Sequence, residues 1–216
     1  MTSTAYAQAR IQARHGARPD PGTWAAVHAS ITLGALLENA RASPLEPWIA
    51  GLDAGCTLDQ LERVLRDRLR GRIEEVARWM PPSWRPAVLW TRELLDLPAA
   101  QRLLRERADE ERAARVRGEW LEAWRRLWPR CGDEDRGELE ALARTVESHI
   151  REFERAPADE AANLRLALKA RVETLFRRHA LGPAAAFDHL LLAALEAERL
   201  RAELVGRVAR GAEPAP

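Results

Sequence analysis

The chain has 216 residues, which suits one domain or two small lobes that share a core. Its 34 Lys and Arg residues nearly cancel 33 Asp and Glu residues, for a formal net charge of +1. This balance argues against a large basic surface that neutralises phosphates. Lys169 is the only lysine. We interpret the arginine excess first as a compositional bias and second as a preference for bidentate pairing with carboxylates.

The two cysteines, Cys56 and Cys131, are far apart in the sequence and form no CxxC pair, which is typical of a reducing compartment. The first residues carry no long apolar segment of a secretory signal. The longest apolar runs, around ITLGALL and HLLLAAL, are far shorter than the roughly 20 residues that span a bilayer. We therefore expect a cytoplasmic protein without direct membrane insertion, which can still belong to a membrane complex.

Strand signals are nearly absent, and the good helix formers Ala, Leu, Arg and Glu dominate. A first amphipathic helix is expected near residues 3–15. A second is expected from Asp20, where Asp-Pro-Gly supplies a cap and a first-turn proline, to about Arg41. The apolar side of this second helix follows the helical spacing and carries Trp24, Val27, Ile31 and Leu37.

Prolines and glycines interrupt the next connector, ASPLEPWIAGLDAG. Thr57 and Gln60 have the spacing of a capping box, which predicts the start of a long helix that continues to Trp79. The following MPPSWRP ends that helix, because proline removes a backbone donor and clashes with the preceding turn. A shorter helix then continues to Asp96.

Another helix is expected from Pro98 to Trp128, and three more near residues 135–155, 158–180 and 183–209. The helix that ends at Trp128 carries an aromatic stripe, which we interpret as a face that packs on the core or on another helix: Trp120, Trp124, Leu127 and Trp128. The pattern predicts an all-α fold, a multi-helix bundle without a sheet, formed as a single domain over residues 1–216. Residues 210–216 are expected to form a disordered tail.

A weak internal similarity links residues 96–105, DLPAAQRLLR, with residues 160–169, EAANLRLALK. Both segments begin with an acidic residue and end with a leucine followed by a basic residue. Short matches of this kind arise easily in sequence rich in Arg, Leu and Ala. The similarity leaves open a division into two pseudo-repeat halves, 1–106 and 107–209.

Several possible metal ligands lie close together in the last predicted helix, including Asp188, His189, Glu196 and Glu198. His189 and Glu196 share a helix face, but they are about 10 Å apart along the helix axis, so one ion cannot bind both. A di-iron bundle would need two Glu-x-x-His pairs on facing helices, and the sequence contains none. We therefore expect no metal and no cofactor.

Catalysis and nucleic-acid binding are also disfavoured. The sequence shows no local signature of a Ser/His/Asp or Cys/His arrangement and no Gly-rich phosphate loop. Its arginines alternate with Glu and Asp at helical spacings, as in RERADEERAARVR, which is typical of solvated or pairing helix faces. We expect neither an enzyme acting alone nor a nucleic-acid partner.

The last predicted helix places two charged residues, Glu198 and Arg201, where its period calls for apolar side chains. A step of 100° per residue aligns them with Phe187, Leu190, Leu191, Ala194 and Val205. If this stripe is buried to its end, the two charges must satisfy each other, since an unpaired buried charge costs several kcal/mol. If the helix extends beyond the core, both are hydrated and contribute little. Both alternatives remain open from these residues.

The segment FDHLLLAALEAERLR resembles the C-terminal signature of the central-stalk connector of archaeal-type and vacuolar-type (A-type and V-type) rotary ATPases. This family comprises the connector of the bacterial and archaeal enzymes and its counterpart in the vacuolar enzyme. Its pattern is roughly Tyr-Leu, five variable positions, then Glu-Ile-x-Asn-Leu-Arg. His189 and Leu190 take the place of Tyr-Leu, Glu196 that of the glutamate, and Leu200 and Arg201 that of the closing Leu-Arg. His189, Ala197 and Arg199 depart from the pattern.

Two further segments carry the resemblance. The N-terminal YAQARIQAR is similar to a family helix that often reads Tyr-x-x-Ala-Arg, and the family repeats segments of the type Asp-x-x-Asn-Leu-(Lys/Arg). The residues that match these patterns are candidates for family-specific roles: Tyr6, Arg10, Asp96, Arg105, Asn163, Glu196, Leu200 and Arg201.

The resemblance implies a non-catalytic connector that links the rotating central shaft to the membrane proteolipid ring. It would couple ATP turnover to proton or sodium transport, with no cofactor of its own, from the cytoplasmic side of the inner membrane. Usual family members carry three repeated helical subdomains, whereas this chain has room for about two, so it resembles a short bacterial member. The alternative is an unrelated all-helical adaptor that binds other proteins.

Overall fold

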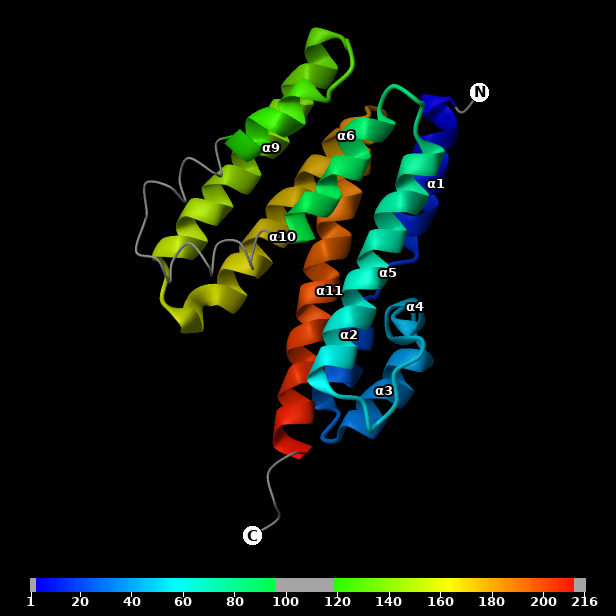
Figure 1. Ribbon diagram of the computed structural model, residues 1–216, viewed down its shortest axis with the longest axis vertical. Helices are drawn as coiled ribbons and strands as arrows, with labels where there is room; N and C mark the ends of the chain where they lie inside the picture. Colours follow the sequence, from blue (N-terminus) through cyan, green and yellow to red (C-terminus); the bar gives the residue numbers. More distant parts are fainter. Residues whose placement is uncertain (1–2, 96–118, 212–216) are drawn as a thin grey trace. The chain divides into compact units, whose positions relative to one another are not determined.

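The computed structural model describes residues 3–95 and 119–211, and within these two ranges the chain forms helices and connecting turns but no strand (Figure 1). This confirms the predicted all-α fold. None of the helices in the described ranges is both long and apolar enough to cross a lipid bilayer.

Within residues 3–95 and within residues 119–211, short connections join successive helices. In chain order the elements are α1 (Thr4–Gly16), α2 (Pro21–Ala29), α3 (Leu33–Arg41), α4 (Glu46–Ile49), α5 (Leu58–Trp79), α6 (Arg85–Trp90), the 3₁₀ helix η1 (Thr91–Leu95), a helical segment at 119–126, α9 (Asp133–Arg155), the 3₁₀ helix η2 (Ala158–Glu160), α10 (Ala161–Arg178) and α11 (Ala184–Gly211). Most of the predicted helix that follows Pro98 lies outside the described residues, as do Asp96 and most of the predicted tail.

The predicted capping box at the start of α5 is confirmed. The backbone N–H of Thr57 donates to Gln60 Oε1 at 2.8 Å, and the N–H of Gln60 donates to Thr57 Oγ1 at 3.2 Å. Asp20 caps α2 as predicted, because its carboxylate accepts the N–H of Thr23 at 2.6 Å. Each cap satisfies backbone donors that the first helical turn leaves without a partner.

The single helix predicted from Asp20 to Arg41 is wrong, because the chain forms two helices there. The hydroxyl of Ser30 donates to the carbonyl of Ala26, and Ser30 then turns to extended backbone and ends α2. Thr32 opens α3 by accepting the N–H of Ala35 at 3.2 Å. Ile31, predicted on the apolar face, lies in the break between them and is 86% exposed.

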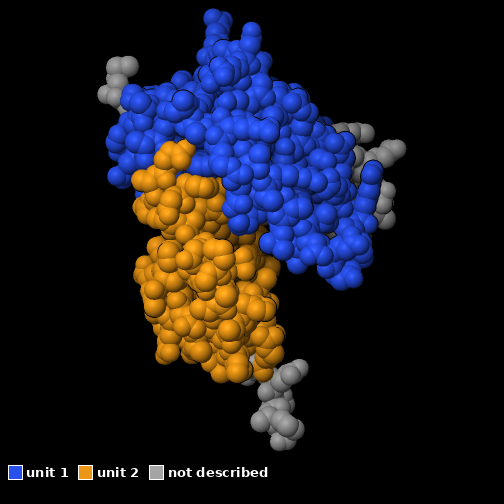
Figure 2. Space-filling model, turned by 180° about the vertical axis from the view of Figure 1, so that it is seen from behind, with its two compact units in different colours: residues 1–11, 73–191 blue, residues 12–72, 192–216 orange. Residues whose placement is uncertain are grey.

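The described chain divides into two compact units, and each combines two separate segments of the sequence (Figure 2). Unit 1 comprises Met1–Ile11 and Ile73–Leu191, and unit 2 comprises Gln12–Arg72 and Leu192–Pro216. The boundaries fall inside α1, α5 and α11. The units therefore do not coincide with the sequence halves 1–106 and 107–209.

Aromatic side chains fill the core of unit 1. Trp84 and Trp124 both meet Phe187 edge-on, with ring centroids 6.3 and 5.1 Å from it. Trp124 is only 5% exposed, so the predicted aromatic stripe faces the core at this position. Contacts of this kind contribute about 0.5–1.5 kcal/mol each beyond the area that they bury.

The core of unit 2 is aliphatic and is built around α2, α3, the first part of α5 and the second half of α11. Its fully buried side chains include Val27, Leu36, Leu37, Leu61, Leu200 and Leu204. Burial of a leucine-sized side chain stabilises the fold by about 1.5–3 kcal/mol. This core fixes which face of α11 is buried in unit 2.

Candidate functional site

The second half of α11 carries the C-terminal family-motif residues, and its buried face differs from the predicted stripe. The buried residues of this half follow a helical rhythm: Leu192, Ala193, Glu196, Ala197, Leu200, Leu204 and Arg207. Glu198 is exposed, and Arg201 is only partly buried. The prediction that Glu198 and Arg201 lie on the apolar stripe is therefore wrong. The cause is that alanines and leucines occur on nearly every side of this helix. The sequence is therefore compatible with more than one choice of buried face.

Glu196 is the most deeply buried acidic residue in the second half of α11. Its side chain is 8% exposed and forms an ion pair with Arg18, whose side chain is 12% exposed. Arg18 follows α1, 178 positions away in the sequence. A buried pair of this kind costs desolvation, but removal of one partner is strongly destabilising because the other charge stays in the interior.

Arg201 forms its hydrogen-bonded ion pair with another helix, and the charge of Glu198 attracts it in addition. Its Nε donates to Glu62 Oε1 on α5 at 2.6 Å. Both side chains are a little more than a third exposed, so water and salt screen the interaction. Glu198 is thus exposed to water, which was one of the two predicted alternatives. Arg201 instead connects α11 to α5 within unit 2.

Arg207 is a buried charge that the sequence analysis did not identify. Its guanidinium donates to the carbonyls of His28 at 2.7 Å and Ser30 at 3.1 Å, which belong to the C-terminal end of α2. It also pairs with Glu203, one turn earlier on α11. A cation at a helix C-terminus satisfies carbonyls that lack a helical partner and interacts favourably with the helix dipole.

The other candidate residues lie in unit 1 or outside the described residues. Tyr6 on α1 is 47% exposed, and the guanidinium of Arg10, one turn later, lies 5.3 Å from the ring centroid of Trp79. Asn163 is exposed on α10. Asp96 and Arg105 lie outside the described residues. The structure therefore groups Glu196, Leu200 and Arg201 on one segment of α11, and Tyr6 with Arg10 on α1.

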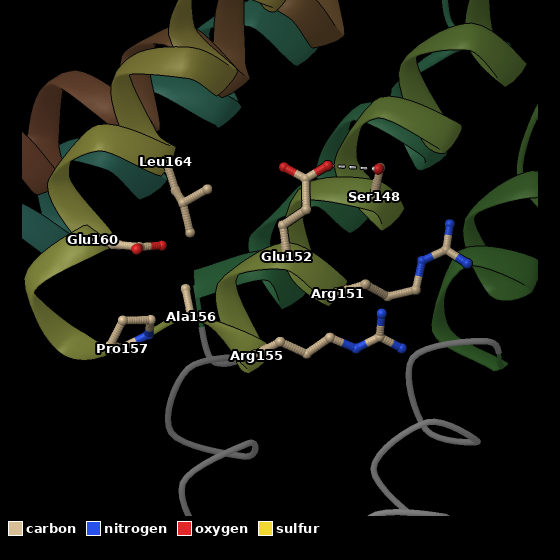
Figure 3. Close-up of a pocket in the computed structure, with 8 residues that line it drawn as sticks. All are labelled: Ser148, Arg151, Glu152, Arg155, Ala156, Pro157, Glu160 and Leu164. Atoms are coloured by element: carbon tan, nitrogen blue, oxygen red, sulfur yellow. Dashed lines mark hydrogen bonds between the residues drawn. The ribbon is translucent and has the colours of Figure 1, made fainter.

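A hollow of about 630 Å³ opens between the end of α9 and the start of α10 in unit 1 (Figure 3). The guanidinium groups of Arg151 and Arg155 lie on one side of it, while Glu152 accepts a hydrogen bond from Ser148 Oγ at 3.0 Å. This hydrogen bond, together with Arg171, lowers the pKa of Glu152 below its ordinary value. A carboxylate held in its ionised form is a weak general base near neutral pH. The hollow does not suggest acid–base chemistry.

The other reactive groups of the described residues are acidic side chains, histidines and two cysteines. Within residues 3–95 and 119–211 no three His, Cys, Asp or Glu side chains gather closely enough to hold a metal ion. Cys56 and Cys131 are free thiols, and burial raises the pKa of each above its ordinary value. A raised pKa reduces the reactive thiolate fraction.

No family model, curated protein or solved structure matches this chain. The resemblance to the rotary-ATPase connectors therefore rests on the motif residues and their positions.

Proposed function

We propose that this chain is a non-catalytic connector in the central stalk of a bacterial vacuolar/archaeal-type rotary ATPase. The observation that carries the proposal is the setting of the three C-terminal motif residues in unit 2. Glu196 forms a buried ion pair, Leu200 is fully buried, and Arg201 is bonded to α5. These three residues hold α11 in place. The sequence signature therefore has a structural reason and needs no catalytic role.

The helical architecture supports a mechanical role. A torque-bearing part needs stiff elements joined by contacts that resist sliding, and α11 is fixed in unit 2 by Glu196, Arg201 and Arg207. Charged hydrogen bonds have restricted geometry, so they oppose a shift of one helix along another. A connector of this kind transmits force between its neighbours and needs no cofactor.

The partners in this proposal are the central shaft and the membrane proteolipid ring, and the connector couples ATP turnover to proton or sodium transport. It resides on the cytoplasmic face of the inner membrane through the complex. Exposed motif residues with few contacts inside the chain are the best candidates for contacts with partners. Tyr6 and Asn163 meet this description.

Affinity purification from detergent-solubilised membranes of the source cells tests the proposal. The tagged chain is expected to co-purify with shaft and ring proteins identified by mass spectrometry. The Asn163→Ala variant should capture less of these proteins, whereas Leu166→Ala, a change of an exposed residue on the same helix, serves as the matched control. Recovery of neither shaft nor ring proteins would contradict the proposal and favour an unrelated helical adaptor.

A further inference from the structure

Three titratable side chains from three helices meet at the turn between α10 and α11 in unit 1. His179 is the residue at which α10 ends, Asp188 lies in the second turn of α11, and Glu138 comes from α9. Their position is independent of the residues that carry the proposed function, because all three belong to unit 1.

His179 and Asp188 form a buried pair. The distance between His179 Nδ1 and Asp188 Oδ2 is 2.7 Å, and the two side chains are 5% and 0% exposed. The other carboxylate oxygen of Asp188, Oδ1, is buried and accepts no hydrogen bond from the described residues. A buried carboxylate with one unsatisfied oxygen carries a large desolvation cost, which protonation would reduce.

Glu138 is the third member of the cluster, and its carboxylate lies against the turn. A Cβ atom at Gly182 would lie 3.2 Å from Glu138 Cδ and still closer to Oε2, so the carboxylate occupies the space that a side chain would need. Glu138 Oε2 is buried and also has no hydrogen-bond partner among the described residues. The N–H of Gly182 donates to the carbonyl of His179 at 2.9 Å, which ties the turn to the same cluster.

The surrounding charges favour proton uptake. The charged groups that act on the cluster are Glu134 and Asp135 from α9 and Arg178 from α10, and His189 follows Asp188 on α11. Two carboxylates, Glu134 and Asp135, thus act on the cluster against one arginine, Arg178. The imidazolium of His179, bonded to Asp188 and within electrostatic range of Glu138, therefore lies in a negative potential that stabilises its charge.

We propose that Glu138, His179 and Asp188 form a proton-linked latch, which holds the α10–α11 turn against α9 and loosens as the pH rises. The protons belong to the cluster as a whole, because the three groups interact and titrate together. Loss of a proton leaves His179 neutral and the buried carboxylates without their cationic partner, so the turn opens more often.

The pKa directions agree with this geometry. Burial raises the pKa of Asp188 and of Glu138. Burial alone would lower the pKa of His179, but the hydrogen bond and charge of Asp188, with the charge of Glu138, outweigh it and raise that pKa. Each group thus binds its proton more tightly in the folded state. Their stabilising effect is complete below the unfolded pKa values and is lost as the pH rises through the folded ones.

Amide hydrogen exchange across residues 179–190 tests the latch. After correction for intrinsic rates, we expect protection to fall as the pH rises above about 4, the unfolded range of the carboxyls, and further above about 6.5, the unfolded value of histidine, by up to about tenfold for each unit by which a pKa is raised. In Asp188→Asn the fall should disappear, and in Glu138→Gln it should be smaller. Glu147→Gln, on α9 but outside the cluster, should behave as the wild type. Protection that stays constant or rises in the wild type would overturn the proposal, as would an unchanged fall in Asp188→Asn.

A second measurement needs no variant and so does not depend on whether a substitution folds. Imidazole titration by NMR should give His179 a midpoint above the ordinary value of about 6.5. His149 is the internal control, because burial lowers its pKa and its midpoint should lie below that value. A His179 midpoint at or below that of His149 would overturn the latch.

Discussion

Helix α11 carries two carboxylates in opposite situations, Asp188 in unit 1 and Glu203 in unit 2. Among the described residues, the Asp188 carboxylate has only the His179 imidazole as its hydrogen-bond partner, and burial raises its pKa. Burial alone would raise the pKa of Glu203, but hydrogen bonds from His28 and Arg207 outweigh it and lower that pKa. The balance between burial and partners decides which protonation state the fold favours: burial outweighs the imidazole at the fully buried Asp188, whereas the two partners outweigh burial at the less buried Glu203.

Arginine and histidine differ as partners because arginine keeps its proton at every physiological pH, whereas histidine can lose it. The arginine pairs of unit 2 are therefore permanent within that range. The histidine cluster of unit 1 responds to pH. Helix α11 thus relies mainly on permanent arginine pairs in unit 2, where His28 also bonds Glu203, and on a histidine pair in unit 1.

The largest effect is expected when the buried cation of unit 2 is removed. Arg207→Ala removes the donor to the C-terminal carbonyls of α2 and the arginine partner of Glu203, which keeps its contact with His28, and should lower the free energy of unfolding by about 3–5 kcal/mol. Urea denaturation followed by circular dichroism measures this change. Arg210→Ala, an exposed arginine one turn later, is the control and should change it by less than about 0.5 kcal/mol.

A smaller effect is expected at the turn of unit 1. Gly182→Ala places a methyl group in the space of the Glu138 carboxylate, the flexible end of its side chain, and should lower the free energy of unfolding by about 1 kcal/mol or less as that carboxylate shifts. Most of the loss should vanish in the Glu138→Ala background, because the obstructing atoms are then gone. Equal losses in both backgrounds, measured as a double-mutant cycle, would disprove the contact.

The pH response should have the opposite sign in unit 2. The lowered pKa of Glu203 contributes stability that is present above its unfolded value of about 4.5 and is lost as the pH falls through the folded value. We expect a loss of about 1 kcal/mol or less on acidification. Amide exchange in α2 measures this loss. The loss should be absent in Glu203→Gln; its persistence there would assign it to other carboxylates.

The smallest effect is expected at the partly exposed pair. Arg201→Ala removes the hydrogen bond to Glu62 and should lower the free energy of unfolding by only about 0–1 kcal/mol, because water screens the interaction. Denaturation in low and high salt checks this expectation, since a screened pair should matter even less in high salt. A loss above about 2 kcal/mol would mean that the pair is more buried than its exposure indicates.

Local features of the fold could be predicted from the sequence. The caps at Asp20 and Thr57 involve residues within three positions, and the core-facing Trp124 follows from one helical stripe. The break before Thr32 also left a local signal, because threonine is a favoured N-cap, but the continuous apolar spacing concealed it.

The candidate site could be predicted only in part. The family resemblance identifies Glu196 as a motif residue, whereas the apolar period alone places Glu198 on the buried stripe. The partner of Glu196, Arg18, and the α2 carbonyls that bind Arg207 lie more than 170 positions away in the sequence. No periodicity within one helix can identify such partners, because they depend on the packing of the whole unit.

The central claim is that Glu196, and not Glu198, is the charge that α11 buries at its motif. Urea denaturation of two variants, Glu196→Gln and Glu198→Gln, tests it most directly, because the substitutions are identical and two positions apart. We predict a loss of about 2–3 kcal/mol for Glu196→Gln, which removes a charged hydrogen-bond partner from buried Arg18, and less than about 0.5 kcal/mol for Glu198→Gln. Equal losses, or a larger loss for Glu198→Gln, would contradict the account.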